Sequence, residues 1–220
     1  ACFKPELPRF FIDRLTRPGD VVYDPFVGRG TTSLEAALRG RRPVGCDVNP
    51  LSRSLLDPRL RPPELDDVRR RLEQVDLSSE VAAPAELLAF YHPATLQQIC
   101  ALRMHLLGRT DDARQDTVDG WIRMVALNRL TGHSSGFFSV YTMPPNQAVS
   151  VASQRRINAR REQTPPRRDV RELILRKSKA LLRDCDAATR RTLAGVAPYA
   201  RTLTASAENT PQLADGQVDL

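Results

Sequence analysis

Long apolar runs, a leader-like N-terminus and paired cysteines are all absent from this sequence. No stretch of about 18 consecutive apolar residues occurs, so we expect no membrane-spanning helix. The first ten residues lack the charged and then apolar layout of a signal peptide, and we expect a cytoplasmic protein. Cys2, Cys46, Cys100 and Cys185 stand far apart without Cys-x-x-Cys spacing, which argues against a disulfide framework, a zinc site or another metal centre.

Lysine is scarce, and the positive charge is unevenly placed. Three of the 33 basic residues are lysines, and the chain has a net charge of +7. Residues 155–183 hold eleven basic and three acidic side chains, so this stretch alone carries +8. The rest of the 220-residue chain is close to neutral, which makes the position of the charge informative. Arginine suits phosphate recognition through its planar, forked guanidinium group.

The alternation of apolar segments predicts a parallel α/β sheet near the N-terminus. Residues 5–16 have helical spacing, VVYD at 21–24 is typical of a strand, and TTSLEAALRG at 31–40 is typical of a helix that ends at a glycine. A second strand, PVGCDV, and a further helix from about residue 49 follow. Strands that alternate with helices at this spacing favour parallel pairing.

The pattern changes after about residue 60. Helical signals dominate up to residue 191, interrupted by a loop at 132–150 that is rich in glycine, serine, proline and aromatic residues. Strand signals return in YARTLTASA at 199–207 and in GQVDL at 216–220. A strand near the C-terminus needs other strands to pair with, and the N-terminal segment provides them. We therefore predict one α/β core formed by 1–60 and 199–220, with 61–198 as a large helical insertion.

The stretch DPFVGRGTT at 24–32 joins the first strand to a helix and has the features of a ligand-binding loop. Gly28 and Gly30 allow the backbone to approach a ligand closely, and the helix start leaves amide groups that need acceptors. Asp47 ends the second strand, 19 positions after Gly28. In nucleotide-type α/β sites an acidic residue about 20 positions past the glycine loop holds ribose hydroxyls.

The arrangement of these residues resembles the S-adenosylmethionine-dependent DNA amino-methyltransferases. The loop lacks the third glycine of the dinucleotide fingerprint and instead reads Asp-Pro-Phe-x-Gly-x-Gly-Thr-Thr, which is similar to motif I of that family. FKPELPRFFI at 3–12 resembles motif X, and RRPVGCDVNP at 41–50 resembles motif II. The resemblance implies a class I methyltransferase-like, Rossmann-like fold and S-adenosylmethionine as cofactor.

The resemblance also implies a role for each matching residue. The loop under the methionine part of the cofactor would include Asp24, Phe26, Gly28 and Gly30. Thr31 and Thr32 would cap the helix and reach the cofactor carboxylate, which Lys4 would neutralise. Asp47 would hold the ribose, with Val48 and Asn49 beside the adenine, and Ser206 or Glu208 would take the place of the motif III acid.

No catalytic residue can be assigned. Members of that family carry Asp, Asn or Ser before Pro-Pro and an aromatic residue (motif IV), which accepts the amino hydrogens of a flipped base and stacks on it. The Pro-Pro pairs in RPPE (61–64), MPPN (143–146) and TPPR (164–167) lack these flanking residues. We expect motif IV in a missing segment, after Leu220 or before Ala1, or in a second chain.

The basic stretch is the predicted contact with DNA phosphates. The side chains expected to provide it are Arg155, Arg156, Arg160, Arg167, Arg168 and Arg171. The aromatic residues Phe137, Phe138 and Tyr141 allow two interpretations: they either stack on bases or anchor their loop to the core. Trp121 lies on a helical apolar stripe and is expected in the core.

These observations favour a site-specific DNA methyltransferase, or its cofactor-binding portion, that methylates the exocyclic amino group of adenine or cytosine. One alternative is an RNA methyltransferase acting on transfer RNA guanine, because its motif I can read the same way. An alternative of another class is a non-catalytic nucleic-acid-binding partner that keeps a cofactor site.

Overall fold

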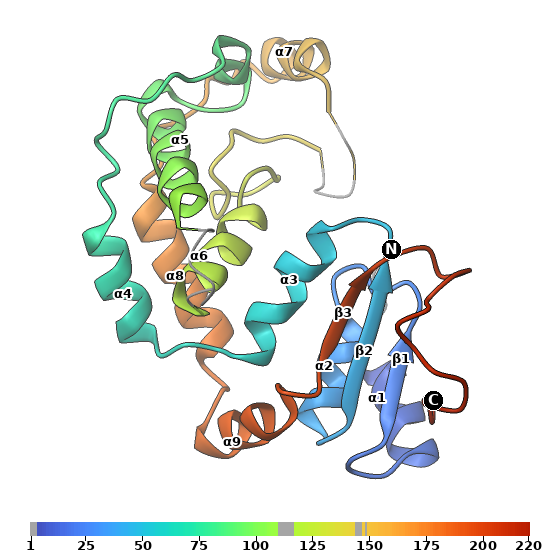
Figure 1. Ribbon diagram of the computed structural model, residues 1–220. Coiled ribbons are helices and arrows are strands. Elements are labelled where there is room, and N and C mark those ends of the chain that lie inside the picture. The colour runs from blue at the N-terminus through green and yellow to red at the C-terminus, as the bar shows by residue number, and fades with distance from the viewer. Residues whose placement is uncertain (1–3, 110–116, 144–146, 148) are drawn as a thin grey trace. The chain divides into compact units, whose positions relative to one another are not determined.

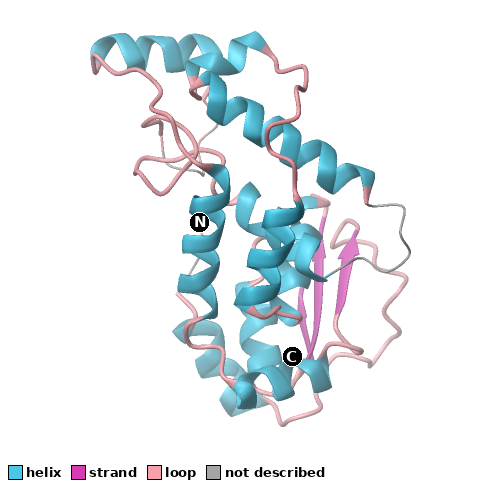
Figure 2. Ribbon diagram, turned by 90° about the vertical axis from the view of Figure 1, so that its left-hand side faces the viewer, coloured by secondary structure: helices cyan, strands magenta, loops and turns pink. Residues whose placement is uncertain are grey.

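The computed structural model describes residues 4–109, 117–143, 147 and 149–220. The chain divides into two compact units, the first formed by residues 1–62 and 183–220 and the second by residues 63–182. All strands of the described part lie in the first unit, and the second consists of helices and loops (Figure 2). No helix among the described residues is long and apolar enough to cross a membrane.

The first unit contains a parallel sheet in the order β1-β2-β3 (Figure 1). The strands are β1 (Val21–Asp24), β2 (Arg42–Asp47) and β3 (Arg201–Thr204). Val21 is paired with Arg42, and Val44 with Arg201, so the carboxyl ends of the three strands lie at the same edge. These strands agree with the predicted mixed α/β class and the predicted parallel pairing.

A second polypeptide segment reaches the free edge of β1. The amide of Leu220 donates to the carbonyl of Val21 (3.3 Å), and the carbonyl of Leu220 accepts from the amide of Tyr23 (2.7 Å). Leu220 thus bonds to the residues on both sides of Val22, and this pattern is typical of parallel strand pairing. The segment 216–220, predicted as the start of a strand, contains no assigned strand, but its last two residues, Asp219 and Leu220, bond to the start of β1, where the chain end lies in Figure 1.

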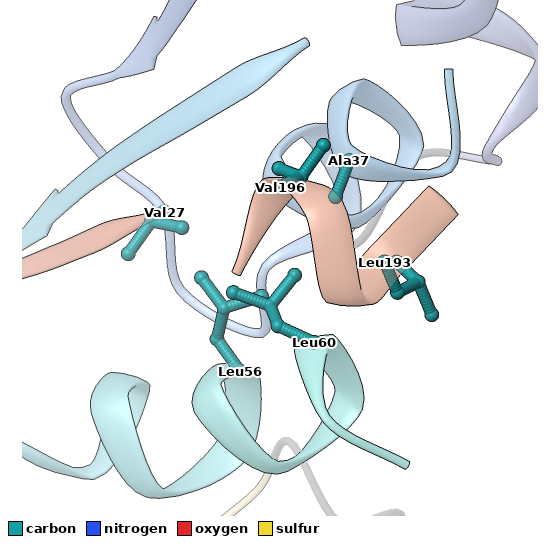
Figure 3. Packing of buried hydrophobic residues seen from close by; sticks show 6 residues of the cluster. All are labelled: Val27, Ala37, Leu56, Leu60, Leu193 and Val196. Atoms are coloured by element: carbon teal, nitrogen blue, oxygen red, sulfur yellow. The ribbon is translucent and has the colours of Figure 1, made fainter. Parts of the chain in front are cut away.

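The helices of this unit hold the sheet through a small apolar core. Ala36 and Ala37 are fully buried because α2 packs closely on the strands, and alanine allows that approach. Leu56 and Leu60 of α3 contact α2 and α9 in the cluster shown in Figure 3. The helices are α1 (Glu6–Leu15), α2 (Thr31–Leu38), α3 (Leu51–Leu60) and α9 (Ala187–Val196).

The position of α9 differs from the prediction that 61–198 is one insertion. Leu193 and Val196 of α9 are buried against Ala37 and the two leucines of α3, so this helix belongs to the first unit. Its N-cap Asp186 accepts a hydrogen bond from the amide of Thr189 (2.8 Å) and fixes where the helix begins. The sequence pattern could not predict that α9 belongs to the first unit, because the apolar face of a helix does not reveal which hydrophobic core it packs against.

The second unit is helical. Trp121 is buried as predicted, and its indole Nε1 donates to Ser178 Oγ (3.0 Å). Asp119 is also buried and pairs with Arg71 (2.5 Å) and Arg109 (2.6 Å), which joins three helices. The elements are α4 (Leu65–Gln74), the 3-10 helix η1 (Ala85–Ala89), α5 (Pro93–Gly108), α6 (Thr117–Leu127), α7 (Val151–Arg160) and α8 (Val170–Leu182).

Gly30 is the position where the loop geometry excludes a side chain most clearly. Its φ is +79°, and a Cβ there would lie 2.7 Å from Leu56 Cδ1. We predict that Gly30→Ala destabilises the protein by about 2–4 kcal/mol, from the left-handed backbone and the overpacking together. Urea unfolding measures this loss.

Gly19 provides the matched control, because its φ is +96° but a Cβ there would have no atom within 4 Å. Gly19→Ala should therefore lose only about 1 kcal/mol. Equal losses in the two variants would show that the contact with Leu56 contributes nothing.

Candidate functional site

The site lies at the carboxyl edge of the sheet, where three chain segments meet. Asp24 Oδ1 accepts from the amide of Phe26 (3.0 Å), which closes a turn around Pro25. The amide of Val27 donates to the carbonyl of Cys46 (2.9 Å), and the amide of Ala205 donates to the carbonyl of Asp47 (3.1 Å). The glycine loop, the end of β2 and the residues after β3 are therefore tied together.

Asp47 links the end of β2 to the glycine loop. Its Oδ2 accepts from the amide of Gly28 (2.9 Å), and its Oδ1 accepts from the amide of Asn49 (2.8 Å). The hydrogen bond from Asn49 lowers the pKa of Asp47, partial burial opposes this, and the bond from Gly28 lowers the pKa further. A side-chain hydrogen bond from Ser52 also lowers the pKa. A carboxylate has about four acceptor positions, so these three hydrogen bonds leave one of them open.

The start of α2 offers uncapped amide groups. Gly30 is the N-cap in a left-handed conformation and provides no side-chain hydrogen bond. The first backbone bond of the helix runs from Leu34 to Gly30 (3.0 Å), and within the described residues the amides of Thr31, Thr32 and Ser33 have no acceptor. Three such amides at the positive end of a helix dipole form a suitable environment for a carboxylate.

The prediction that Thr31 and Thr32 cap this helix is wrong. Thr31 is its first helical residue, and a hydroxyl caps a helix from the preceding position, which Gly30 occupies. Both threonines are half-buried in the first turn, next to the uncapped amides. Sequence reasoning missed the left-handed Gly30, although a Gly-Thr boundary after a strand is a signal for it.

Two apolar side chains of these loops, one of them next to Asp47 in the sequence, are unusually exposed. Phe26 is 78% exposed and Val48 is 73% exposed. A Cβ placed on Gly28 would have only the carbonyl oxygen of Phe26 nearby, at 3.7 Å, so the loop is open at that point. Open backbone flanked by apolar groups and a carboxylate is an arrangement that suits a nucleoside.

Among the described residues, the remaining ones predicted to bind the cofactor form no side-chain hydrogen bond or ion pair with the glycine loop. Lys4 is exposed before α1, and in the described part of the chain it forms no hydrogen bond or ion pair with the glycine loop. Asn49 is exposed, and its Oδ1 accepts from the amide of Leu51 (3.0 Å). Ser206 Oγ accepts from the amide of Glu208 (3.3 Å), so the hydroxyl stabilises a turn while the carboxylate of Glu208 is exposed.

The predicted phosphate-binding arginines divide into two groups. Arg155, Arg156 and Arg160 are exposed on α7, and Arg167 is exposed beyond it. Arg168 is half-buried, with its backbone amide bonded to Thr95. Arg171 donates to the carbonyls of Leu72 (3.0 Å) and Val75 (3.1 Å), so its guanidinium supports the end of α4. No signal in the sequence indicates that internal use of Arg171.

Motif IV has no counterpart in the described residues. In RPPE the carbonyl of Pro62 accepts from Arg190 Nη1 (2.5 Å), and TPPR lies between α7 and α8. Residues 144–146 of MPPN lie outside the described residues. Groups of three or more metal-ligating side chains do not occur in the described residues either.

Comparison with known proteins supports the resemblance stated for the N-terminal motifs. Residues 1–53 match the model of a family described as DNA methylase. The chain is 48% identical over 48 residues to the Type II methyltransferase M.XycI of Xanthomonas campestris pv. cyanopsidis, covering 22% of this chain and 16% of the relative. It is 29% identical over 70 residues to the Type II methyltransferase M.MjaII of Methanocaldococcus jannaschii, covering 32% and 13%.

The matches are confined to a part of each protein. A third relative, the Type II methyltransferase M.BsoBI of Geobacillus stearothermophilus, is 44% identical over 41 residues, which is 19% of this chain and 8% of the relative. The chain thus spans well under a fifth of the length of these relatives. No solved structure matches. Resemblance to the DNA amino-methyltransferase family is confirmed, and the residues matched by the family model include the glycine loop and Asp47.

Asp47 should make folding stability depend on pH. Because its pKa is lowered in the folded state, its charged form stabilises the protein above the unfolded pKa, and this contribution is lost as pH falls through the folded pKa. We predict that the difference in free energy of unfolding between the wild type and Asp47→Asn is largest near neutral pH and shrinks below about pH 4.

Urea unfolding of both proteins from about pH 7 to pH 3 measures this difference. Asp76 and Asp186 also have lowered pKa values, but they are present in both proteins, so their contributions cancel. A difference that stays constant over this range would mean that the hydrogen bonds to Asp47 do not stabilise its charged form.

Proposed function

We propose that this chain, whose first 53 residues match the DNA methylase family, is the cofactor-binding portion of a DNA methyltransferase. The methyl group would pass from S-adenosylmethionine to the exocyclic amino group of adenine or cytosine. The observation that supports this best is the hydrogen bond between Asp47 and the amide of Gly28, because it joins the ribose-type acid to the glycine loop.

The residues present fit S-adenosylmethionine. The uncapped amides of Thr31, Thr32 and Ser33 suit the carboxylate of its methionine part. The remaining acceptor position of Asp47 suits a ribose hydroxyl, and the exposed Val48 and Phe26 suit an adenine ring. When bound, the cofactor supplies a methyl group on a positively charged sulfur.

Glu208 is the better of the two candidates for the adenine amino group. The hydroxyl of Ser206 already accepts a backbone hydrogen bond, whereas Glu208 presents a free carboxylate just after the segment that Asp47 anchors. Lys4 would approach the carboxylate of the cofactor from the start of α1. The Pro-Pro pairs of residues 1–220 lack the flanking side chains of motif IV, so we propose that other polypeptide binds the amino group of the target base.

Binding of S-adenosylmethionine is the first test. Asp47→Ala should weaken binding by about 1–3 kcal/mol, the free energy lost when buried polar partners go unpaired. Isothermal titration calorimetry measures this change.

The control is Asp186→Ala, which removes a carboxylate that accepts an amide hydrogen bond in the same unit but at the start of α9. It should lower stability and leave the affinity for the cofactor unchanged. If Asp47→Ala binds as tightly as the wild type, Asp47 does not belong to the site.

Binding to DNA is the second test. Replacing Arg155, Arg156 and Arg160 by glutamine should weaken binding to all DNA sequences alike and reduce the salt slope by roughly 0.9 for each lost phosphate contact. Fluorescence anisotropy at several salt concentrations gives the slope, and the same assay with RNA tests the alternative substrate.

A triple variant of Arg69, Arg70 and Arg103 removes equal charge from other exposed positions of the second unit. Its salt slope should remain close to that of the wild type. If both triple variants behave alike, net charge alone accounts for binding, and α7 has no special role.

A further inference from the structure

Tyr141 is an exposed aromatic residue in a loop whose two phenylalanine side chains are buried. Its neighbours Phe138 and Val140 are 1% and 5% exposed, and Phe137 is buried as well, whereas Tyr141 is 37% exposed. Phe137 and Phe138 thus anchor the loop to the core, which is the second of the two interpretations of this cluster. The Tyr141 side chain is not part of the core, unlike those of the neighbouring residues, so its exposure requires a separate explanation.

The backbone of Tyr141 is held by a network of side-chain amides. Its carbonyl accepts from Gln154 Nε2 (3.0 Å) and from Gln163 Nε2 (2.9 Å). Both amides also donate to Asn158 Oδ1, each at 2.8 Å, and Asn158 Nδ2 donates to the carbonyl of Ala89 (2.8 Å). Gln154 is fully buried, and within the described residues its Nε2 is bonded while its Oε1 has no partner. Burying an amide donor is costly unless it is hydrogen-bonded, so the bonds of Nε2 favour one backbone position for the Tyr141 carbonyl.

Arg161 covers one face of the exposed ring. Its guanidinium carbon lies 3.8 Å from the centroid of the Tyr141 ring. The chain reverses immediately after it: Glu162 has a φ of +50°, and the amide of Gln163 returns to the carbonyl of Asn158 (3.0 Å). The left-handed conformation of Glu162 follows the C-cap, where helices commonly end in this way, and it places Arg161 at the end of α7.

The surroundings of the pair are positively charged. Arg155, Arg156 and Arg160 are exposed on α7, the helix that ends beside Arg161. Within the described residues none of these four arginines forms an ion pair with a carboxylate. A flat aromatic ring with a stacked guanidinium, next to unpaired arginines, has the chemistry that recognises a base together with its neighbouring phosphates.

We propose that the Tyr141–Arg161 pair stacks on an unpaired base of the DNA while the arginines of α7 hold the adjacent phosphates. A base inside an intact duplex has both faces covered by its neighbours, so only an unpaired base offers a face to the pair. Opening a base pair to methylate one base also exposes its partner, and the pair would stabilise such a nucleotide. This proposal rests on the proposed function in DNA methylation.

The test uses Tyr141→Ala and three DNA probes: a matched duplex, the same duplex with 2-aminopurine opposite an abasic site, and the single strand. Tyr141→Ala should lose roughly 5- to 100-fold affinity for the two probes with an unpaired base, the range expected for one base–aromatic stack. Affinity for the matched duplex should change little, because the arginines of α7 remain.

Further variants separate stacking from folding. Tyr141→Phe keeps the ring and should bind like the wild type, and Tyr141→Leu keeps the bulk without the ring and should bind like Tyr141→Ala. The control is Tyr199→Ala, because Tyr199 is 53% exposed and has Arg42 above its ring (4.3 Å) but lies outside the basic stretch. It should bind all three probes like the wild type.

The fluorescence of 2-aminopurine reports the stack directly, and its quenching by the wild type should disappear in Tyr141→Leu. Wild-type binding with no quenching, or an equal loss of affinity for all three probes in Tyr141→Leu, would overturn the stacking proposal and leave the proposed function intact. Failure of the wild type to bind any of the probes would instead contradict the proposed action on DNA.

Discussion

The hydrogen bond from the amide of Gly28 to Asp47 is the interaction on which the arrangement of the candidate site depends. It joins two strands at their carboxyl ends and, together with the turn that Asp24 closes at Phe26, fixes the shape of the loop. The same carboxylate binds the amide of Asn49, and the backbone carbonyl of Asp47 receives the amide of Ala205. One residue thus positions the three segments that would surround a nucleoside.

Glycine makes this geometry possible in two different ways. Gly30 is required by packing, because Leu56 occupies the space where a side chain would lie. Gly28 has open space around it, and there the missing side chain leaves the backbone accessible. The loop is therefore pressed against α3 on one side and open to a ligand on the other, and the uncapped start of α2 follows directly from the left-handed turn at Gly30.

The second unit has its own internal constraints. Asp119 with its two arginines and Trp121 with Ser178 hold the helices together, so the arginine-rich stretch does not have to stabilise this unit as a whole. Arg171 supports the end of α4, and Arg176 donates to the carbonyl of Ser135 (3.4 Å), so these two arginines make contacts within the unit. The remaining exposed arginines of α7 and the Tyr141–Arg161 pair are then available for a partner, and DNA matches both their charge and their aromatic surface.

The sequence predicted the strands, the parallel pairing and the family resemblance well, because short apolar segments, glycines and an acid at fixed spacing are local signals. It failed where the outcome depended on tertiary packing. The core that α9 covers, the internal role of Arg171 and the choice of Gly30 as N-cap are examples. The burial of Phe138 and the exposure of Tyr141 could not be predicted either, because both are aromatic residues of one loop. The hydrogen bonds of the side-chain amides to the Tyr141 carbonyl distinguish the two positions only in the folded structure.

A crystal structure of this chain with S-adenosylmethionine tests the central claim most directly. We predict that a ribose hydroxyl binds the open acceptor position of Asp47 while its bond to Gly28 persists, and that the carboxylate of the cofactor binds the amides of Thr31, Thr32 and Ser33. A cofactor bound away from the carboxyl ends of β1 and β2, or one that displaces Gly28 from Asp47, would contradict it.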